Sequence, residues 1–405
     1  MKKKLLFTLI LVCTPALMKA QPFSISEEAE ISIITVGPGK NLYDKFGHCA
    51  FRVRDPQNQL DWAYNYGTYD FNTPNFYTKF AQGKLLYQLT VAYFDSFLET
   101  YQEENRWVKA QVLNLTYSEK NALFHYLQNN AKPEHRDYKY DFFFDNCATK
   151  IRDVLVAVLG KELQYNDSFV KEAFTFRQLI QKNVRPNTWG SLGMDVATGA
   201  VIDKKATAWD YQFLPQYVYE AAAVATINRQ GMEEPLVKTP QSLFENKPEK
   251  QASHFIESPL FIFGILGFLL VFCTYKEARK NIRYRFLDGF IFFVTGLIGV
   301  FLLLLWFATD HSTTVMNYNV LWAFPISLLL AYWVSKKRPP KWMRRYLVLL
   351  VLMLLLIGLH SITGVQTFAI GLTPLFIALG IRYLYVLGFL KRQSSLLPAE
   401  ENNGA

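Results

Sequence analysis

The sequence predicts an α+β exported domain followed by an all-α membrane domain of about five transmembrane helices. A short charged and apolar segment at the N-terminus is typical of a secretory signal. A mixed, more polar half follows, in which strand and helix patterns alternate, and long apolar runs dominate the rest. The 405 residues suffice for two domains. The predicted parts are a signal peptide (1–20), an exported domain (21–230), a juxtamembrane linker (231–254), a transmembrane domain (255–392) and a cytoplasmic tail (393–405).

The N-terminal segment has the three parts of a secretory signal. Lysines at 2–4 form a positive start, an apolar stretch follows at 5–12, and Ala20 ends a site of small residues. Cleavage is therefore expected before Gln21. The alternative is an uncleaved membrane helix, which the shortness of the apolar stretch disfavours.

The exported half shows turn residues between strand-like and helix-like runs. A hairpin is predicted where two alternating segments flank the turn 55–58, and Ser118 is placed to cap a helix. Pro, Glu, Lys and Gln enrich the segment 231–254, which is typical of a linker. The predicted elements are strands at 31–36, 47–54, 60–66, 87–92 and 107–115, helices at 94–104, 118–129 and from 147 onward, and helices with loops over 165–230.

The C-terminal half contains five apolar segments, each near the roughly 20 residues that a bilayer requires. Basic residues follow the first, third and fifth segments, whereas the loops 309–319 and 363–368 contain no Lys or Arg. The positive-inside rule places the basic loops in the cytoplasm and the N-terminal domain on the other side. The predicted spans are 256–275, 286–308, 320–335, 346–362 and 369–390.

Cys147 and His48 are the candidates for chemistry in the exported half. Cys147 begins a predicted helix, whose N-terminal amides and dipole stabilise a thiolate, and an imidazole such as that of His48 can accept the thiol proton. The alternatives are a buried structural thiol and an ordinary strand histidine. Cys49 is a poorer nucleophile candidate because its side chain points away from that of His48 on a strand. This geometry also disfavours a Cys49–Cys147 disulfide.

Polar residues lie at the predicted outer ends of the spans. Asp310 and His311 end the second span, and Asn317 and Asn319 precede the third. One interpretation is that these are ordinary polar residues of the membrane–water interface. The other is a polar cluster that faces the exported domain at the membrane surface. Arg382 lies inside the fifth span, where it could snorkel toward the cytoplasm.

Composition and residue spacing exclude two other classes of site. The net charge of +9 comes largely from the predicted cytoplasmic loops, and no basic patch with interleaved aromatic residues indicates nucleic-acid binding. The histidines are scattered, and Cys147 has no second thiol at ligand spacing. We therefore expect no metal and no cofactor.

The sequence motifs resemble a known family. Gly47-His48-Cys49-Ala50 on a strand, followed by Asn146-Cys147 at a helix start, resembles the circularly permuted papain-like fold of NlpC/P60-type peptidases and lecithin:retinol acyltransferase. More narrowly, the chain is similar to the Lnb family. The segments that carry this similarity are 45–48, 64–71, 144–149, 213–215, Thr309-Asp310-His311 and 317–322.

This resemblance implies a lipoprotein N-acyltransferase with Cys147 as nucleophile and His48 as base. The third catalytic residue is expected on the strand after the histidine strand, where Asn65 fits best. The backbone amide of Cys147, with the Tyr43 hydroxyl, is expected to hold the oxyanion. Residues that complete the expected site are the alternative third residues Asp61 and Asp70, the supporting Asn146, and the membrane-facing Asp310, His311, Asn317 and Asn319.

The implied reaction has a membrane phospholipid as acyl donor, a Cys147 thioester as intermediate, and the α-amine of the diacylglyceryl-cysteine of a lipoprotein as acceptor. The expected location is the bacterial inner membrane, with the N-terminal domain in the periplasm. The alternatives are a cell-wall cysteine peptidase or amidase of the NlpC/P60 type, a non-catalytic membrane scaffold, and a small transporter, which the scarcity of charged residues within the spans disfavours.

Overall fold

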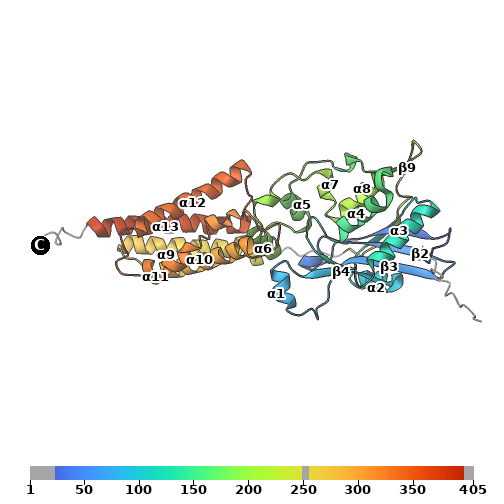
Figure 1. Cartoon of the computed structure of the whole chain (residues 1–405). Helices are drawn as coiled ribbons and strands as arrows, with labels where there is room; N and C mark the ends of the chain where they lie inside the picture. Colours follow the sequence, from blue (N-terminus) through green and yellow to red (C-terminus); the bar gives the residue numbers. More distant parts are fainter. Residues whose placement is uncertain (1–22, 249–254, 396–405) are drawn as a thin grey trace, which may run out of the picture.

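A computed structural model describes residues 23–248 and 255–395, so the predicted signal peptide lies outside the described residues. A mixed α+β domain and a helical bundle lie end to end (Figure 1). This arrangement confirms the predicted fold class. Cys147 begins a helix that comes later in the chain than the strand of His48, which is the order found in a permuted papain-like fold.

The exported domain is built around an antiparallel seven-stranded sheet in the order β10-β5-β1-β2-β3-β4-β6. The predicted hairpin is confirmed as β2 and β3, which pair on either side of a turn. The strands of this sheet are β1 (Glu30–Val36), β2 (His48–Asp55), β3 (Leu60–Thr68), β4 (Leu86–Tyr93), β5 (Val108–Val112), β6 (Asp137–Lys139) and β10 (Gln241–Phe244).

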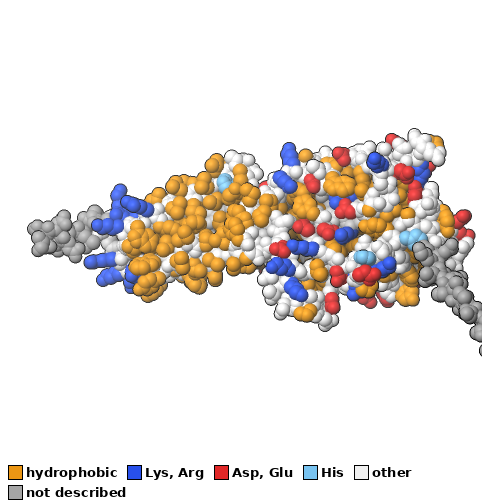
Figure 2. All heavy atoms as spheres, in the orientation of Figure 1, with side chains coloured by type: hydrophobic (Ala, Val, Ile, Leu, Met, Phe, Trp, Pro, Cys, Tyr) orange, Lys and Arg blue, Asp and Glu red, His pale blue; other side chains and the backbone are white. Residues whose placement is uncertain are grey.

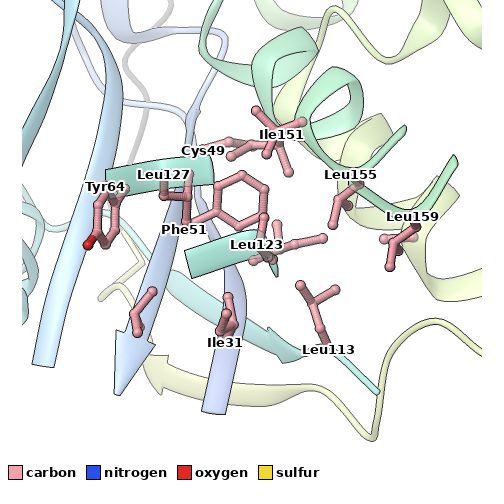
Figure 3. Packing of buried hydrophobic residues seen from close by; sticks show 14 of the residues in the cluster. Ile31, Cys49, Phe51, Tyr64, Leu113, Leu123, Leu127, Ile151, Leu155 and Leu159 are labelled. Atoms are coloured by element: carbon pink, nitrogen blue, oxygen red, sulfur yellow. The ribbon is translucent and has the colours of Figure 1, made fainter. Parts of the chain in front are cut away.

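Helices cover both faces of the sheet. On one face, α4 (Cys147–Leu159) and α3 (Tyr117–Asn130) pack Ile151, Leu155 and Leu123 against Phe51 of β2 (Figure 3). On the other face, α2 (Phe94–Glu103) contributes Phe94 to a separate core. Alternation of side chains along each strand supplies apolar residues to both faces. The sheet therefore holds α4, and with it Cys147, in a fixed position.

Two local predictions in this domain need correction. The cap of α3 is Thr116, which forms a capping box with Glu119, and not Ser118, which lies within the helix. The predicted linker 231–254 includes β9 (Met232–Pro235) and β10, and β10 pairs with β5 at the edge of the main sheet. Backbone pairing therefore extends the exported domain beyond its predicted end.

The exported domain contains further helices and a second, smaller sheet. A small sheet joins β7, β8 and β9. An aromatic core that includes Phe143, Phe176 and Phe213 holds the helices together. These elements are α1 (Phe76–Ala81), α5 (Phe176–Asn183), α6 (Trp189–Ala197), α7 (Ala208–Tyr211), α8 (Pro215–Val224), β7 (Leu163–Gln164) and β8 (Thr226–Arg229).

Within the described residues, the membrane domain has four helices that are long and apolar enough to cross a bilayer, and one shorter apolar helix in place of the third predicted span. Pro325 divides the short span, because proline cannot donate the amide hydrogen bond of a helix interior. Gly289, Gly296 and Gly299 let the short helix pack closely on its neighbour. The helices are α9 (Pro259–Lys280), α10 (Arg285–Phe307), α11 (Ile326–Val334), α12 (Met343–Thr363) and α13 (Thr373–Ser395).

The surface of the bundle agrees with the predicted orientation. Apolar side chains cover its length, and Lys and Arg gather at the end remote from the exported domain (Figure 2). The exported domain therefore lies on the side opposite the basic loops.

Arg382 is not a snorkelling residue. It is fully buried within the bundle and is hydrogen-bonded to Glu277 at 2.6 Å and to Asp288 at 2.8 Å. Asp288 also pairs with Arg283 at 3.0 Å. Three helices thus share a buried charge network, because each charge finds its partner on another element.

Candidate active site

Asn146 determines how α4 begins. Its Oδ1 accepts hydrogen bonds from the amides of Ala148 and Thr149 at 2.8 and 3.0 Å, and its Nδ2 donates to the carbonyl oxygens of Phe142 and Phe213. The side chain is thus used as a helix cap and as an anchor. Asn146 supports the site by placing Cys147 as the first residue of the helix.

The N-terminus of α4 lies where β2 and β3 stop pairing. Their register runs from Asp55↔Leu60 to Phe51↔Tyr64 and ends there. The Cys147 sulfur lies at this end of β2 and accepts a hydrogen bond from the backbone amide of Cys49. Cys49 itself is a fully buried free thiol in the core. Cys49 therefore contributes its backbone amide, rather than its side chain, to the surroundings of Cys147.

Cys147, His48 and Asn65 form a hydrogen-bonded series. The imidazole of His48 is hydrogen-bonded to the Cys147 thiol, and its Nε2 lies 2.5 Å from Asn65 Oδ1. An amide oxygen only accepts, so Nε2 carries the proton and Nδ1 is left to face the thiol. Asn65, rather than Asp61 or Asp70, thus occupies the position expected of the third residue.

The electrostatics of the pair favour separated charges. Burial alone would raise the pKa of Cys147, but the positive charge and hydrogen bond of His48, with the amides of Cys49 and Ala148, lower it below its usual value. Burial alone would lower the pKa of His48, but Cys147 and Asn65 raise it overall. These opposite shifts stabilise a thiolate beside an imidazolium, which is the reactive form of a cysteine nucleophile.

Gly67 leaves space beside Cys147. The pairing of β3 with β4 shifts between Asn65 and Thr68, and Gly67 in this bulge has a φ of 91°. A Cβ on Gly67 would lie 3.4 Å from Cys147 Cβ and 3.9 Å from both Cys147 N and the Tyr138 hydroxyl. A glycine meets both needs, the positive φ and the close approach.

Two tyrosines near the pair were missed from the sequence. The Tyr138 hydroxyl is buried and has no hydrogen-bond partner among the described residues. Burial and the nearby Cys147 also raise the pKa of Tyr140 well above its usual value. The only sequence signal was the aromatic run 138–144 before the nucleophile. Tyrosine spacing alone does not show which hydroxyl faces a thiol.

Three other predicted residues have contacts elsewhere. Tyr43 is 80% exposed, and its hydroxyl accepts from Asn41 Nδ2 at 3.1 Å. Asp61 forms an ion pair with Arg52 at 2.5 Å near the turn of the hairpin. Asp70 lies in an exposed turn and accepts from the amide of Asn72. The contacts of these three side chains are not with the Cys147–His48 pair.

Asn317 and Asn319 join the two domains. Both are fully buried, and their side-chain amides donate to backbone oxygens of α6, from Asn317 to Val196 at 2.8 Å and from Asn319 to Asp195 at 3.0 Å. Gly199 approaches the same loop so closely that a Cβ would lie 1.9 Å from Val315 O. The two asparagines therefore act as structural anchors within the interface.

Asp310 and His311 also contact the exported domain. Asp310 pairs with Lys139 at 2.7 Å, and a His311 ring nitrogen lies 3.2 Å from the carbonyl oxygen of Ala81. The cluster thus faces the exported domain, and a role toward substrate stays a prediction. Among the described residues, no group of three or more His, Cys, Asp or Glu is placed to hold a metal ion.

Comparison with known proteins identifies both halves of the chain. The model of the Lnb N-terminal periplasmic domain matches residues 20–182, and the model of the Lnb transmembrane domain matches residues 250–394. No curated protein and no solved structure matches the chain. The matched ranges contain the three residues of the hydrogen-bonded series and all the membrane helices.

Proposed function

The chain belongs to the Lnb-type lipoprotein N-acyltransferase family, and on this premise we propose that it transfers an acyl chain from a membrane phospholipid to lipoproteins through Cys147. The acceptor is the α-amine of the diacylglyceryl-cysteine. The observation that carries the proposal is the Cys147–His48–Asn65 series in a domain anchored to the outer ends of membrane helices.

The first half-reaction forms a thioester. The thiolate of Cys147 attacks the ester carbonyl of the phospholipid, while the thiol proton resides on His48. The carbonyl–oxygen bond of the ester then breaks, and His48 returns the proton to the departing oxygen of the lysophospholipid. Asn65 orients the imidazole and stabilises its charge through both steps.

The oxyanion of this step is held by two donors. The helix amide of Cys147 is one, since Asn146 binds the next two amides of α4 and not that of Cys147. The Tyr138 hydroxyl is the other, in place of the exposed Tyr43. A Cβ on Gly67 would lie 3.9 Å from each donor atom, so the space that this glycine leaves open adjoins both. An oxygen that occupies this space would satisfy the unpartnered Tyr138 hydroxyl.

The second half-reaction forms the amide. The α-amine of the lipoprotein attacks the thioester carbonyl, the carbon–sulfur bond breaks, and His48 accepts a proton from the amine. The sulfur leaves as a thiolate beside the protonated His48, which restores the starting pair. A thioester suits this step because it favours attack by an amine. Both substrates are anchored in the outer leaflet of the inner membrane, which accounts for a thiol domain joined to a bundle.

The thioester is the intermediate to detect. Full-length protein in detergent is mixed with phospholipid that carries a labelled acyl chain, and the peptide that contains Cys147 is analysed by mass spectrometry. We expect a hydroxylamine-sensitive acyl adduct on Cys147, absent from Cys147→Ala and retained in Cys273→Ala, which removes another partly accessible thiol. An unmodified Cys147 in both wild type and Cys273→Ala would contradict the proposed donor step.

A further inference from the structure

A cavity of about 200 Å³ lies at the junction of the two domains. We call it the junction cavity. One side is formed by the end of α1, the start of β4 and the segment before Cys147, and the other by the loop after α10. The lining residues used below are Phe80, Tyr87, Tyr140, Asp310 and Ser312.

The membrane-side wall of the junction cavity is held in place by polar contacts. The Asp310 carboxylate pairs with Lys139 at 2.7 Å, and the Asp310 amide donates to Gln82 O at 2.8 Å. Ser312 Oγ donates to Asp141 Oδ2 at 2.6 Å. These contacts cross between the domains, so the cavity exists only when the membrane domain is docked on the exported domain.

Tyr140 connects the junction cavity to the nucleophile. It lines the cavity, and burial together with the nearby Cys147 raises the pKa of its phenol well above the usual value. Tyr87 stacks on Tyr140 with ring centroids 4.2 Å apart. The backbone pairs Asp141 with Asp145, which folds the cavity-lining segment back toward the start of α4. A group attached to Cys147 therefore has the cavity close by.

The rim of the junction cavity is aromatic and faces the membrane surface. Phe80 is half exposed, and its ring stacks with Phe76 on α1. Phe71 and Tyr77 add further exposed rings. α1 lies beside the junction of the two domains, next to the outer ends of the bundle (Figure 1). Aromatic rings concentrate at this level of a bilayer, so the rim lies where acyl chains enter from lipid.

We propose that the junction cavity binds the acyl chain that is transferred, in the part of the chain next to its carbonyl. The proposal rests on the proposed function. The occupant is the donor chain rather than a chain of the acceptor, because the donor chain stays attached to Cys147 from the first half-reaction to the second. Each methylene of the acyl chain that is buried in the cavity contributes about fourfold to affinity. A bulky side chain that fills the cavity therefore lowers the affinity for long acyl chains more than for short ones.

The test compares acyl donors of different length on the full-length protein in detergent. The probes are phosphatidylethanolamine with long or short acyl chains and p-nitrophenyl acetate, and the readout is the rate of Cys147 acylation without an acceptor. Ser312→Trp fills the cavity, and Phe80→Ala removes a half-exposed wall whose loss does not disturb the core. Ser118→Trp, at an exposed position on α3 and outside the lining of the cavity, is the matched control.

The expected result is a change in the ratio of the long-chain acylation rate to the acetate acylation rate. Ser312→Trp lowers the long-chain rate at least tenfold more than the acetate rate, Phe80→Ala lowers it severalfold more, and Ser118→Trp changes neither. Equal losses for all donors, or wild-type ratios in both cavity variants, overturn the inference. If wild type reacts with acetate but with no phospholipid, the proposed function fails and the inference fails with it.

Discussion

Replacing Asn65 by alanine should weaken the charge separation at the active site by a predictable amount. The substitution removes the 2.5 Å contact with His48 Nε2. A hydrogen bond to a charged partner contributes about 1.5–3 kcal/mol, and 1.36 kcal/mol corresponds to a tenfold change. Asn65 raises the pKa of His48, so its loss lowers that pKa and raises the pKa of Cys147. The thiolate population at neutral pH should therefore fall by about 10- to 100-fold.

The assay is the rate at which iodoacetamide alkylates Cys147 as a function of pH, followed by peptide mass spectrometry. Wild type should react at a pH below the usual pKa of a thiol, since a lowered pKa leaves thiolate at lower pH. Asn65→Ala should shift the midpoint to higher pH by one unit or more. Cys49 serves as an internal reference, because burial raises its pKa. Asp61→Ala is the control. An unchanged profile in Asn65→Ala, or an equal shift in Asp61→Ala, would refute the reasoning.

Three further substitutions test the site, the interface and the bundle. Tyr138→Phe should lower the acylation rate of Cys147 by about 100-fold without moving its alkylation midpoint, because an oxyanion donor acts after thiolate formation; a shifted midpoint would assign Tyr138 to the thiol instead. Asn319→Ala should lower the free energy of unfolding by about 1–3 kcal/mol, because the carbonyl of Asp195 loses its donor; the readout is a lower melting temperature in detergent. Arg382→Met should cost about 3–5 kcal/mol by the same measurement, since Glu277 loses its partner; a wild-type melting temperature would show that the network is dispensable.

Local sequence patterns were sufficient for the elements that carry the catalytic residues. The alternation along β2, the helical period after Cys147 and the turn between β2 and β3 are properties of neighbouring residues, so they predicted the hairpin and the start of α4. The choice of Asn65 on the next strand came from the resemblance to the permuted papain-like fold.

Contacts between distant segments could not be predicted in this way. Asn319 binds a backbone oxygen 124 residues away, and Arg382 binds Glu277 105 residues away. Their residue types suggested a surface cluster and snorkelling, respectively, because nothing local reveals a buried partner. The same holds for Tyr138, whose unpartnered hydroxyl becomes visible only once β3 and α4 are placed together. Pro325, in contrast, was a local signal of the short α11.

The central claim is that Cys147 carries the acyl chain that becomes amide-linked to lipoproteins. It is tested most directly by mass spectrometry of lipoprotein N-terminal peptides from cells that depend on this gene and express either wild type or Cys147→Ala. The account predicts an amide-linked acyl chain with wild type and a free α-amine with the variant. Equal N-acylation with both proteins would contradict the account, and muropeptide profiles of the same cells would then test the cell-wall peptidase alternative.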